Sequence, residues 1–230
     1  MLLSKVKQTL AALAGSALLV CSGGVSADYG LNLPRGVTPI SKEAYDLHML
    51  IMWICVAIGV VVFGAIFISI LKHRKSKGAK PATFHESTTV EIIWTIVPFL
   101  ILIGMAIPAT KALVAMEDTS NADLSVKVTA YQWKWGYDYM DEGVSFISSL
   151  STPKEQILNQ QDKGEHYLLE VDNPLVVQVN KKVRLLLTAN DVIHSWWVPD
   201  LGMKKDAIPG FVNEMWFRAD EEGTYRGQCA

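Results

Sequence analysis

Residues 49–71 read MLIMWICVAIGVVVFGAIFISIL, a run of 23 positions without a charged side chain. As an α-helix with a rise of ~1.5 Å per residue, this run extends about 35 Å, enough to cross the ~30 Å hydrocarbon core of a bilayer. A second apolar run, 92–113, is interrupted only by two prolines and Lys111. Two buried helices of a soluble core are the alternative, but they would need partners over every face. The sequence therefore predicts two membrane-spanning helices.

The composition of the whole chain points the same way. Of the 230 residues, 50% are apolar and 19% are charged, which is unusual for a soluble domain and far from the composition of disordered chains. The net charge of −2 gives no sign of a basic surface, so we expect no nucleic-acid partner. The three cysteines are far apart and odd in number, which excludes a disulfide framework and a paired Cys-x-x-Cys zinc site.

Residues 1–27 have the layout of a secretory signal peptide. Two lysines precede an apolar run at 10–20, and the sequence VSA stands directly before Asp28. Cleavage there leaves 28–48 as the segment ahead of the first span. Lipidation at Cys21 is disfavoured, because a valine precedes this cysteine where a lipidation motif has a small residue.

The loop between the two spans, 72–91, carries five Lys and Arg residues against two glutamates. By the positive-inside rule, such a loop stays in the cytoplasm. Both 28–48 and 114–230 then lie outside, in agreement with the signal peptide. We therefore expect a bacterial inner-membrane protein with two spans, whose N-terminus and C-terminal domain are periplasmic.

The C-terminal part is more acidic than the whole-chain charge indicates. Residues 112–230 contain 11 Lys and Arg against 18 Asp and Glu, a local charge of −7. This charge suits a basic partner, and a solvated acidic face explains it equally well.

Alternating side chains predict that this part is made of β-strands. Aliphatic residues alternate with polar ones over 124–130, and aromatic residues then occupy the other parity over 131–139. Because adjacent strand residues point to opposite faces, a β-bulge near Ala130 would let one long strand carry both patterns.

Two hairpins are predicted further along the chain, the first pairing 175–179 with 183–188 and the second pairing 214–219 with 224–229. A polar stretch, 152–165, reads as an inserted loop. Short strands with Pro- and Gly-containing connections are typical of a Greek-key sandwich. The predicted fold is a two-helix transmembrane hairpin followed by an all-β sandwich.

His194 and Cys229 are the residues best suited to bind a metal. His194 follows a predicted strand, and Cys229 ends a later one 35 residues on. Imidazole and thiolate together favour a borderline or soft metal, copper in particular. On spacing alone, a hydrogen-bonded loop histidine and a small buried cysteine remain simpler alternatives.

Four stretches, in order and spread over most of the chain from residue 46 onward, resemble subunit II of the haem-copper cytochrome c oxidases. They are 90–98 (VEIIWTIVP), 131–137 (YQWKWGY), 191–210 (DVIHSWWVPDLGMKKDAIPG) and 223–229 (GTYRGQC). The resemblance implies a two-helix membrane anchor and a cupredoxin-like sandwich that holds a dinuclear copper centre. Such a subunit accepts electrons from cytochrome c and passes them to haem in subunit I for oxygen reduction.

The same resemblance implies that His194 and Cys229 are copper ligands. The family's motif continues past this cysteine with a glutamate, a second cysteine, a histidine and a methionine, so we expect a C-terminally incomplete chain whose remaining copper ligands lie beyond Ala230. The missing glutamate would also link to magnesium at the subunit interface. A natural short form, the alternative, would hold no stable dinuclear centre.

Further roles follow from the resemblance alone. Trp133 matches the surface indole that accepts electrons from cytochrome c, and Asp138 and Asp191 would supply charge for docking. Glu91 matches a residue at the mouth of a proton pathway into subunit I, although an acid at a helix start is also favoured by the helix dipole. Asp206 matches a residue that faces subunit I.

The implied enzyme is a cytochrome-c oxidase, a proton-translocating oxidoreductase in which this chain alone is inactive. Its partners would be subunit I, subunit III, cytochrome c and membrane lipid. Two alternatives stay open: a quinol oxidase subunit II, and a membrane-tethered periplasmic binding or sensor module without copper. The pair His194 and Cys229 argues against the first, and Glu91 together with the aromatic strand argues against the second.

Overall fold

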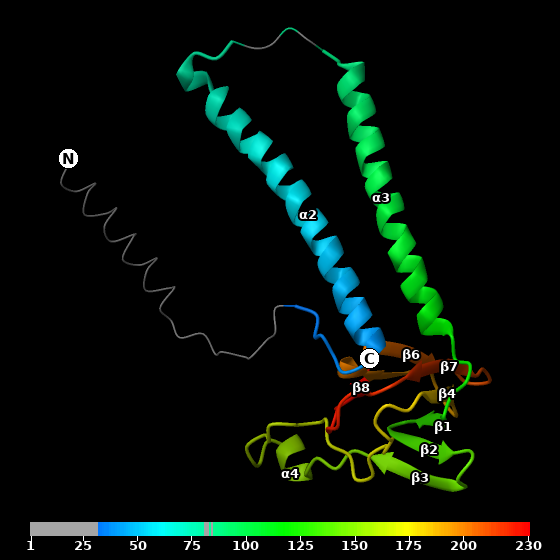
Figure 1. Cartoon of the computed structure of the whole chain (residues 1–230). Helices are drawn as coiled ribbons and strands as arrows, with labels where there is room; N and C mark the ends of the chain where they lie inside the picture. Colours follow the sequence, from blue (N-terminus) through cyan, green and yellow to red (C-terminus); the bar gives the residue numbers. More distant parts are fainter. Residues whose placement is uncertain (1–31, 81–82, 84) are drawn as a thin grey trace, which may run out of the picture. The chain divides into compact units, whose positions relative to one another are not determined.

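The structure is a computed structural model that describes residues 32–80, 83 and 85–230 (Figure 1). The predicted signal peptide, with Cys21, lies outside the described residues. Nearly everything described belongs to one compact unit, Pro34–Ala230; of the other unit, Met1–Leu33, only the last two residues are described.

Two long helices carry the apolar runs. Helix α2 spans Pro39–Lys72 and helix α3 spans Thr88–Glu117, and the short 3-10 helix η1 (Lys75–Lys77) lies between them (Figure 1). Both are long and apolar enough to cross a membrane. Their large apolar side chains are exposed on all sides, which suits a lipid environment and not a soluble core. The helices contain the predicted spans 49–71 and 92–113 and extend beyond them at both ends.

The start of α2 is buried in the sandwich and is held by a capping box. The Thr38 hydroxyl accepts a hydrogen bond from the Ser41 amide (2.9 Å), and the Ser41 hydroxyl accepts one from the Thr38 amide (3.0 Å). Thr38 is 0% exposed and its hydroxyl donates to the Leu201 carbonyl (2.9 Å). The first turn of α2 is therefore part of the core of the compact unit.

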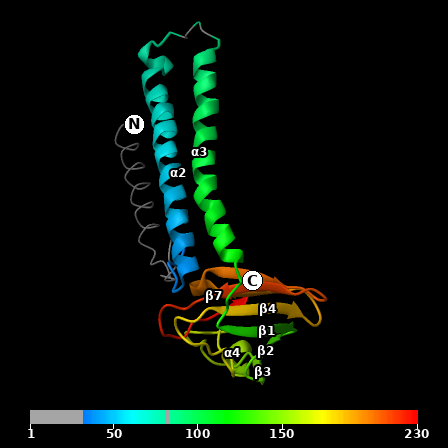
Figure 2. The same ribbon diagram turned by 45° about the vertical axis from the view of Figure 1, so that its right-hand side comes forward.

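The C-terminal half is a β-sandwich, as predicted. Its larger sheet has the strand order β3-β2-β1-β4-β7 (Figure 2), and its smaller sheet has the order β6-β5-β8. Strands β1 and β4 pair in parallel, and the other pairs are antiparallel. The strands are β1 (Leu124–Tyr131), β2 (Lys134–Tyr139), β3 (Val144–Ser149), β4 (Val183–Ala189), β5 (His194–Val198), β6 (Met203–Ala207), β7 (Asn213–Phe217) and β8 (Gln228–Cys229). A four-residue helix, α4 (Lys154–Ile157), lies in the predicted polar loop, and the 3-10 helix η2 (Pro199–Leu201) links β5 to β6.

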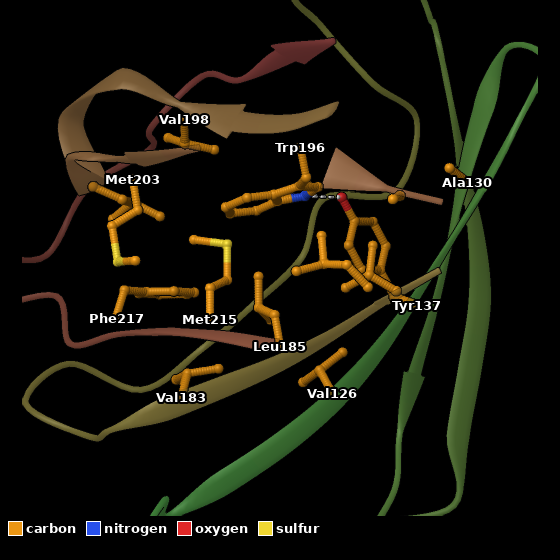
Figure 3. Close-up of a cluster of buried hydrophobic side chains, with 14 of the residues drawn as sticks. Val126, Ala130, Tyr137, Val183, Leu185, Trp196, Val198, Met203, Met215 and Phe217 are labelled. Atoms are coloured by element: carbon orange, nitrogen blue, oxygen red, sulfur yellow. Dashed lines mark hydrogen bonds between the residues drawn. The ribbon is translucent and has the colours of Figure 1, made fainter. Parts of the chain in front are cut away.

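The core lies between the two sheets, where alternate residues of each strand point inward (Figure 3). Val126, Leu185 and Met215 of the larger sheet are fully buried. Trp196 of the smaller sheet stacks on Phe217 of the larger one, with 6.3 Å between ring centroids. This contact joins β5, the strand that begins at His194, to the opposite sheet.

The predicted β-bulge near Ala130 is wrong. The chain instead makes a tight hairpin: β1 ends at Tyr131, β2 begins at Lys134, and these two residues pair directly. Only Gln132 and Trp133 lie in the turn. The change of parity in the sequence therefore marks a reversal of the chain and not an extra residue within one strand.

The two predicted hairpins are also wrong in their pairing. Residues 175–179 form no strand, and the backbone of Val176 bonds instead to the Tyr139 hydroxyl through its carbonyl (2.6 Å) and its amide (3.0 Å). Strand β7 pairs with β4, whereas β8 pairs with β5 in the other sheet. Side-chain alternation identifies strands but does not identify their partners.

The end of α3 is fixed to the sandwich by polar contacts. The Trp216 indole N–H donates to the Ala115 carbonyl (3.1 Å). The Lys182 ammonium donates to the Asp118 and Ser120 carbonyls (both 2.7 Å) and lies 4.4 Å from the centroid of the Trp216 ring. These donors satisfy carbonyls that the end of a helix leaves free.

We predict that replacing Gly202 with alanine destabilises the sandwich strongly. Gly202 has φ +78°, and an added Cβ would lie 2.5 Å from the Ser41 Cβ. The left-handed conformation costs a non-glycine residue roughly 1–2 kcal/mol. The clash with Ser41 adds about 1–3 kcal/mol.

Gly143→Ala is the matched control, because Gly143 has φ +67° and an added Cβ would meet nothing within 4 Å. The full chain in detergent micelles is unfolded in urea and followed by tryptophan fluorescence. Equal losses in the free energy of unfolding for the two variants would contradict the close packing of α2 against Gly202.

Candidate functional site

Strand pairing brings His194 and Cys229 onto neighbouring strands. His194 opens β5, and Cys229 of β8 lies opposite Trp196 in the antiparallel pairing. The Ser195 amide donates to the Cys229 sulfur at 3.5 Å. The His194 side chain is 9% exposed, whereas Cys229 is exposed.

The His194 imidazole is hydrogen-bonded to Asp191. The distance from His194 Nε2 to Asp191 Oδ1 is 2.8 Å. The carboxylate also accepts from the Val192 amide through Oδ1 and from the Gln132 amide through Oδ2, both at 2.7 Å. These bonds, that of His194 above all, lower the pKa of Asp191 to about 2. Since an ionised carboxylate only accepts hydrogen bonds, Nε2 carries the proton and Nδ1 is the free acceptor of the neutral ring.

An aromatic ring restrains the same imidazole from another direction. The Trp135 indole meets the His194 ring nearly edge to face, with 6.0 Å between centroids and 67° between planes. Trp135 belongs to β2 and lies opposite Ala130 of β1. No role was predicted for Trp135 from the sequence, although it lies in the aromatic stretch 131–137 that resembles the family.

Trp133 lies in the turn between β1 and β2 and is 86% exposed. The backbone amide of the neighbouring residue Gln132 donates a hydrogen bond to Asp191, which is also bonded to His194. Two hydrogen bonds thus link the turn that contains Trp133 to the His194 ring. Asp138 is exposed on β2, further along the same hairpin. The structure thus gathers Trp133, Asp191 and His194 at one end of the sandwich.

The structure does not bring Glu91 to this group. Glu91 is exposed in the first turn of α3, where its amide bonds to the Ser87 carbonyl. The 26 residues from Glu91 to Glu117 at the other end of α3 correspond to about 39 Å of helix. Asp206 is exposed on β6 and pairs with Ser195 of β5, one residue from His194.

Within the part of the chain that the structure describes, no group of three or more His, Cys, Asp or Glu side chains could hold a metal ion. His194 and Cys229 offer one imidazole and one thiol from adjacent strands. Those two donor types suit copper, so the residues present fit part of a copper site and do not complete one.

Comparison with known proteins identifies the family. A family model described as "Cytochrome C oxidase subunit II, periplasmic domain" matches residues 124–230, and "Cytochrome C oxidase subunit II, transmembrane domain" matches 26–112. The "Probable cytochrome c oxidase subunit 2" of Rickettsia bellii is 39% identical over 193 residues, covering 84% of this chain and 70% of that protein. The chain belongs to the cytochrome c oxidase subunit II family.

Other relatives agree. The cytochrome c oxidase subunit 2 of Cereibacter sphaeroides is 35% identical over 214 residues, covering 87% of this chain and 71% of that protein. The probable subunit 2 of Rickettsia prowazekii is 39% identical over 194 residues, and the match spans 84% of this chain but 60% of that protein. The crystal structure of the periplasmic domain of subunit II of cytochrome oxidase (CoxB) of Bradyrhizobium japonicum is 42% identical, covers 49% of this chain and 75% of that chain, and has a TM-score of 0.42.

Family membership confirms the resemblance and favours a cytochrome c oxidase subunit over a quinol oxidase subunit or an unrelated binding module. The chain is a component of an oxidase complex, and its two apolar helices make it a membrane protein with two spans.

We predict that Tyr137→Phe destabilises the support beneath β5. The indole N–H of Trp196, which lies opposite Cys229, donates to the Tyr137 hydroxyl at 3.2 Å inside the core (Figure 3). Removing the hydroxyl leaves a buried donor unpaired, which costs about 1–3 kcal/mol. The control is Tyr225→Phe, whose hydroxyl makes an exposed bond to the Glu221 carbonyl. Urea unfolding measures both, and a Tyr137→Phe cost no larger than that of the control would count against this support.

Proposed function

We propose that this chain accepts electrons from cytochrome c on the periplasmic side of a bacterial inner membrane and passes them, through copper, to haem in subunit I for oxygen reduction. The observation that supports this most directly is the link from the exposed turn of Trp133, through Asp191, to the buried ring of His194. An indole at the surface can meet a soluble donor, and the imidazole can bind a metal beneath it.

His194 and Cys229 would be two ligands of a dinuclear copper centre. Imidazole and thiolate donors support copper, and the Nε2 contact with Asp191 leaves Nδ1 of His194 free to bind it. When bound, the copper pair supplies a site that takes up and releases single electrons. His194, whose ring is fixed by Asp191 and Trp135, would bind copper from β5. Cys229 would bind it from the neighbouring strand β8.

Trp133 would be the contact through which electrons arrive from cytochrome c. A single exposed ring gives a small apolar contact that dissociates quickly, and negative charge steers a basic partner toward it. Asp138 is exposed on the same hairpin, and Asp191 adds charge beside Gln132. The charge of −7 over 112–230 supports the same kind of partner.

The membrane orientation follows from the basic loop 72–91, which would face the cytoplasm, with the sandwich on the periplasmic side. Subunits I and III and membrane lipid would cover the exposed apolar faces of α2 and α3. Asp206, exposed beside β5, would face subunit I, where a magnesium ion is also proposed at the interface.

Glu91 would admit protons toward subunit I during proton translocation. Glu91 is exposed in the first turn of α3, next to the basic loop. A carboxylate that accepts protons at a membrane boundary needs such an exposed position. The alternative role, a helix-start acid favoured by the helix dipole, fits the same position.

We predict that Trp133→Gln slows electron uptake about thirtyfold, because the loss of an interface tryptophan costs roughly 2 kcal/mol. The measurement is stopped-flow reduction of the assembled oxidase by reduced cytochrome c at low ionic strength. The matched control is Val176→Gln, which alters an exposed side chain (70%) next to Tyr139 at the far end of β2. Unchanged kinetics in the Trp133 variant, with normal haem content, would refute this role.

We also predict that His194→Ala removes copper from this subunit. The loss of one imidazole typically weakens a metal site by far more than the 10- to 100-fold that loss of an outer partner causes. Copper per haem is measured in the purified complex by elemental analysis. His166→Ala is the control, since His166 lies in the loop 152–170 beside Gly164 and Tyr167, away from β5. Equal copper contents in the two variants would exclude His194 as a ligand.

A further inference from the structure

We propose that Asp191 is a positioning residue: one carboxylate fixes both the ring of His194 and the turn that exposes Trp133. The inference rests on the proposed function, because it concerns how two residues of that site are held. It assigns Asp191 a role different from that of a docking charge.

The three hydrogen bonds of Asp191 reach two parts of the chain that lie far apart in sequence. Oδ1 accepts from His194 and from the Val192 amide, within three residues of Asp191, whereas Oδ2 accepts from the Gln132 amide, 59 residues away. Gln132 belongs to the hairpin of β1 and β2 in the larger sheet, and His194 opens β5 in the smaller sheet. The carboxylate therefore joins the two sheets where the site lies.

Neighbouring contacts make this junction tight. The Asn190 amide donates to the Ala130 carbonyl at 3.0 Å, which holds the segment before Asp191 against the end of β1. Trp135, from the same hairpin, packs its edge against His194. The hairpin that exposes Trp133 thus restrains His194 twice, once through Asp191 and once through Trp135.

The chemistry of the carboxylate also selects the tautomer of His194. An acceptor at Nε2 requires the proton to be there, so the lone pair of the neutral ring is on Nδ1. Metal-binding histidines commonly donate their second ring N–H to a carboxylate in this way. An asparagine at position 191 could present its amide NH2 to Nε2 instead, which would stabilise the opposite tautomer.

The positioning role and the docking role of Asp191 predict different effects of salt. The effect of a docking charge is screened as salt rises, because ions weaken interactions between exposed charges over ~10 Å at 0.1 M. The effect of a positioning group persists at high salt, because its three hydrogen bonds are internal to the chain. Asp138 is the matched comparison, as an exposed aspartate on the same hairpin.

The first experiment needs no copper and uses the full chain in detergent micelles. Nitrogen NMR of the His194 ring reports the tautomer, and hydrogen exchange reports the Gln132 and Val192 amides. In Asp191→Asn we expect the Nε2–H form to lose its dominance, because the side-chain NH2 then faces His194. Exchange at Val192, which loses its Oδ1 acceptor, should rise about tenfold, the effect of losing one hydrogen bond, whereas Gln132 keeps an oxygen acceptor. Asp138→Asn, which removes the same charge, should change neither.

Asp191→Glu provides a second test should the asparagine variant fold poorly. It keeps the charge but moves the carboxylate by one methylene, so positioning predicts faster exchange at Gln132, whereas docking predicts wild-type behaviour. An unchanged tautomer and unchanged exchange in the folded position-191 variants would overturn the proposal.

The second experiment measures reduction of the assembled oxidase by cytochrome c from low to high salt. We expect the Asp191→Asn defect to persist at high salt and the Asp138→Asn defect to vanish. A position-191 defect that disappears with salt would make Asp191 a docking charge only. If Trp133→Gln has no effect but the NMR changes occur, the proposed route of electron uptake fails while the positioning role stands.

Discussion

The pairing of β8 with β5 is the contact on which the candidate site depends. Strand β8 contains only Gln228 and Cys229, and they meet Trp197 and Trp196 of β5. This short ladder places a thiol beside the strand that begins with His194, and the Ser195 amide bonds to the sulfur. Below the ladder, Trp196 is anchored by stacking on Phe217 and by its bond to Tyr137, so the site rests on buried aromatic residues of the core.

The opposite side of the site depends on the hairpin of β1 and β2. The hairpin exposes the ring of Trp133, which lies in the turn, and places the ring of Trp135, which belongs to β2, against His194. One short stretch of chain consequently provides both an exposed indole and a ring that contacts His194. Polar contacts of Thr38 with Leu201 and of Trp216 with Ala115 hold the sandwich to helices α2 and α3.

Sequence alone predicted those features that depend on local physics. The spans follow from the absence of charge over 49–71, since a charged side chain in lipid is costly wherever it lies. The alternation of side chains located β1, β2, β4, β7 and the region of β8, but not β3, β5 or β6. Strand partners were not predictable, because the change of parity near Ala130 fits a bulge as well as a turn, and the long-range partner of β8 leaves no local pattern. His194 and Cys229 were found from residue type and family resemblance. The bridging role of Asp191 and the edge contact of Trp135 were missed, because each joins segments about 59 residues apart in the chain.

The buried capping box of α2 has a consequence for the order of biosynthesis. Thr38 bonds to Leu201, 163 residues later, and Lys42 pairs with Asp220, 178 residues later. The first turn of α2 thus leaves the ribosome early, whereas its partners are translated only when nearly all of the sandwich has been made. Until then the Thr38 hydroxyl lacks its Leu201 acceptor, so a helix that is made before the sandwich reaches its final contacts only after the sandwich is complete.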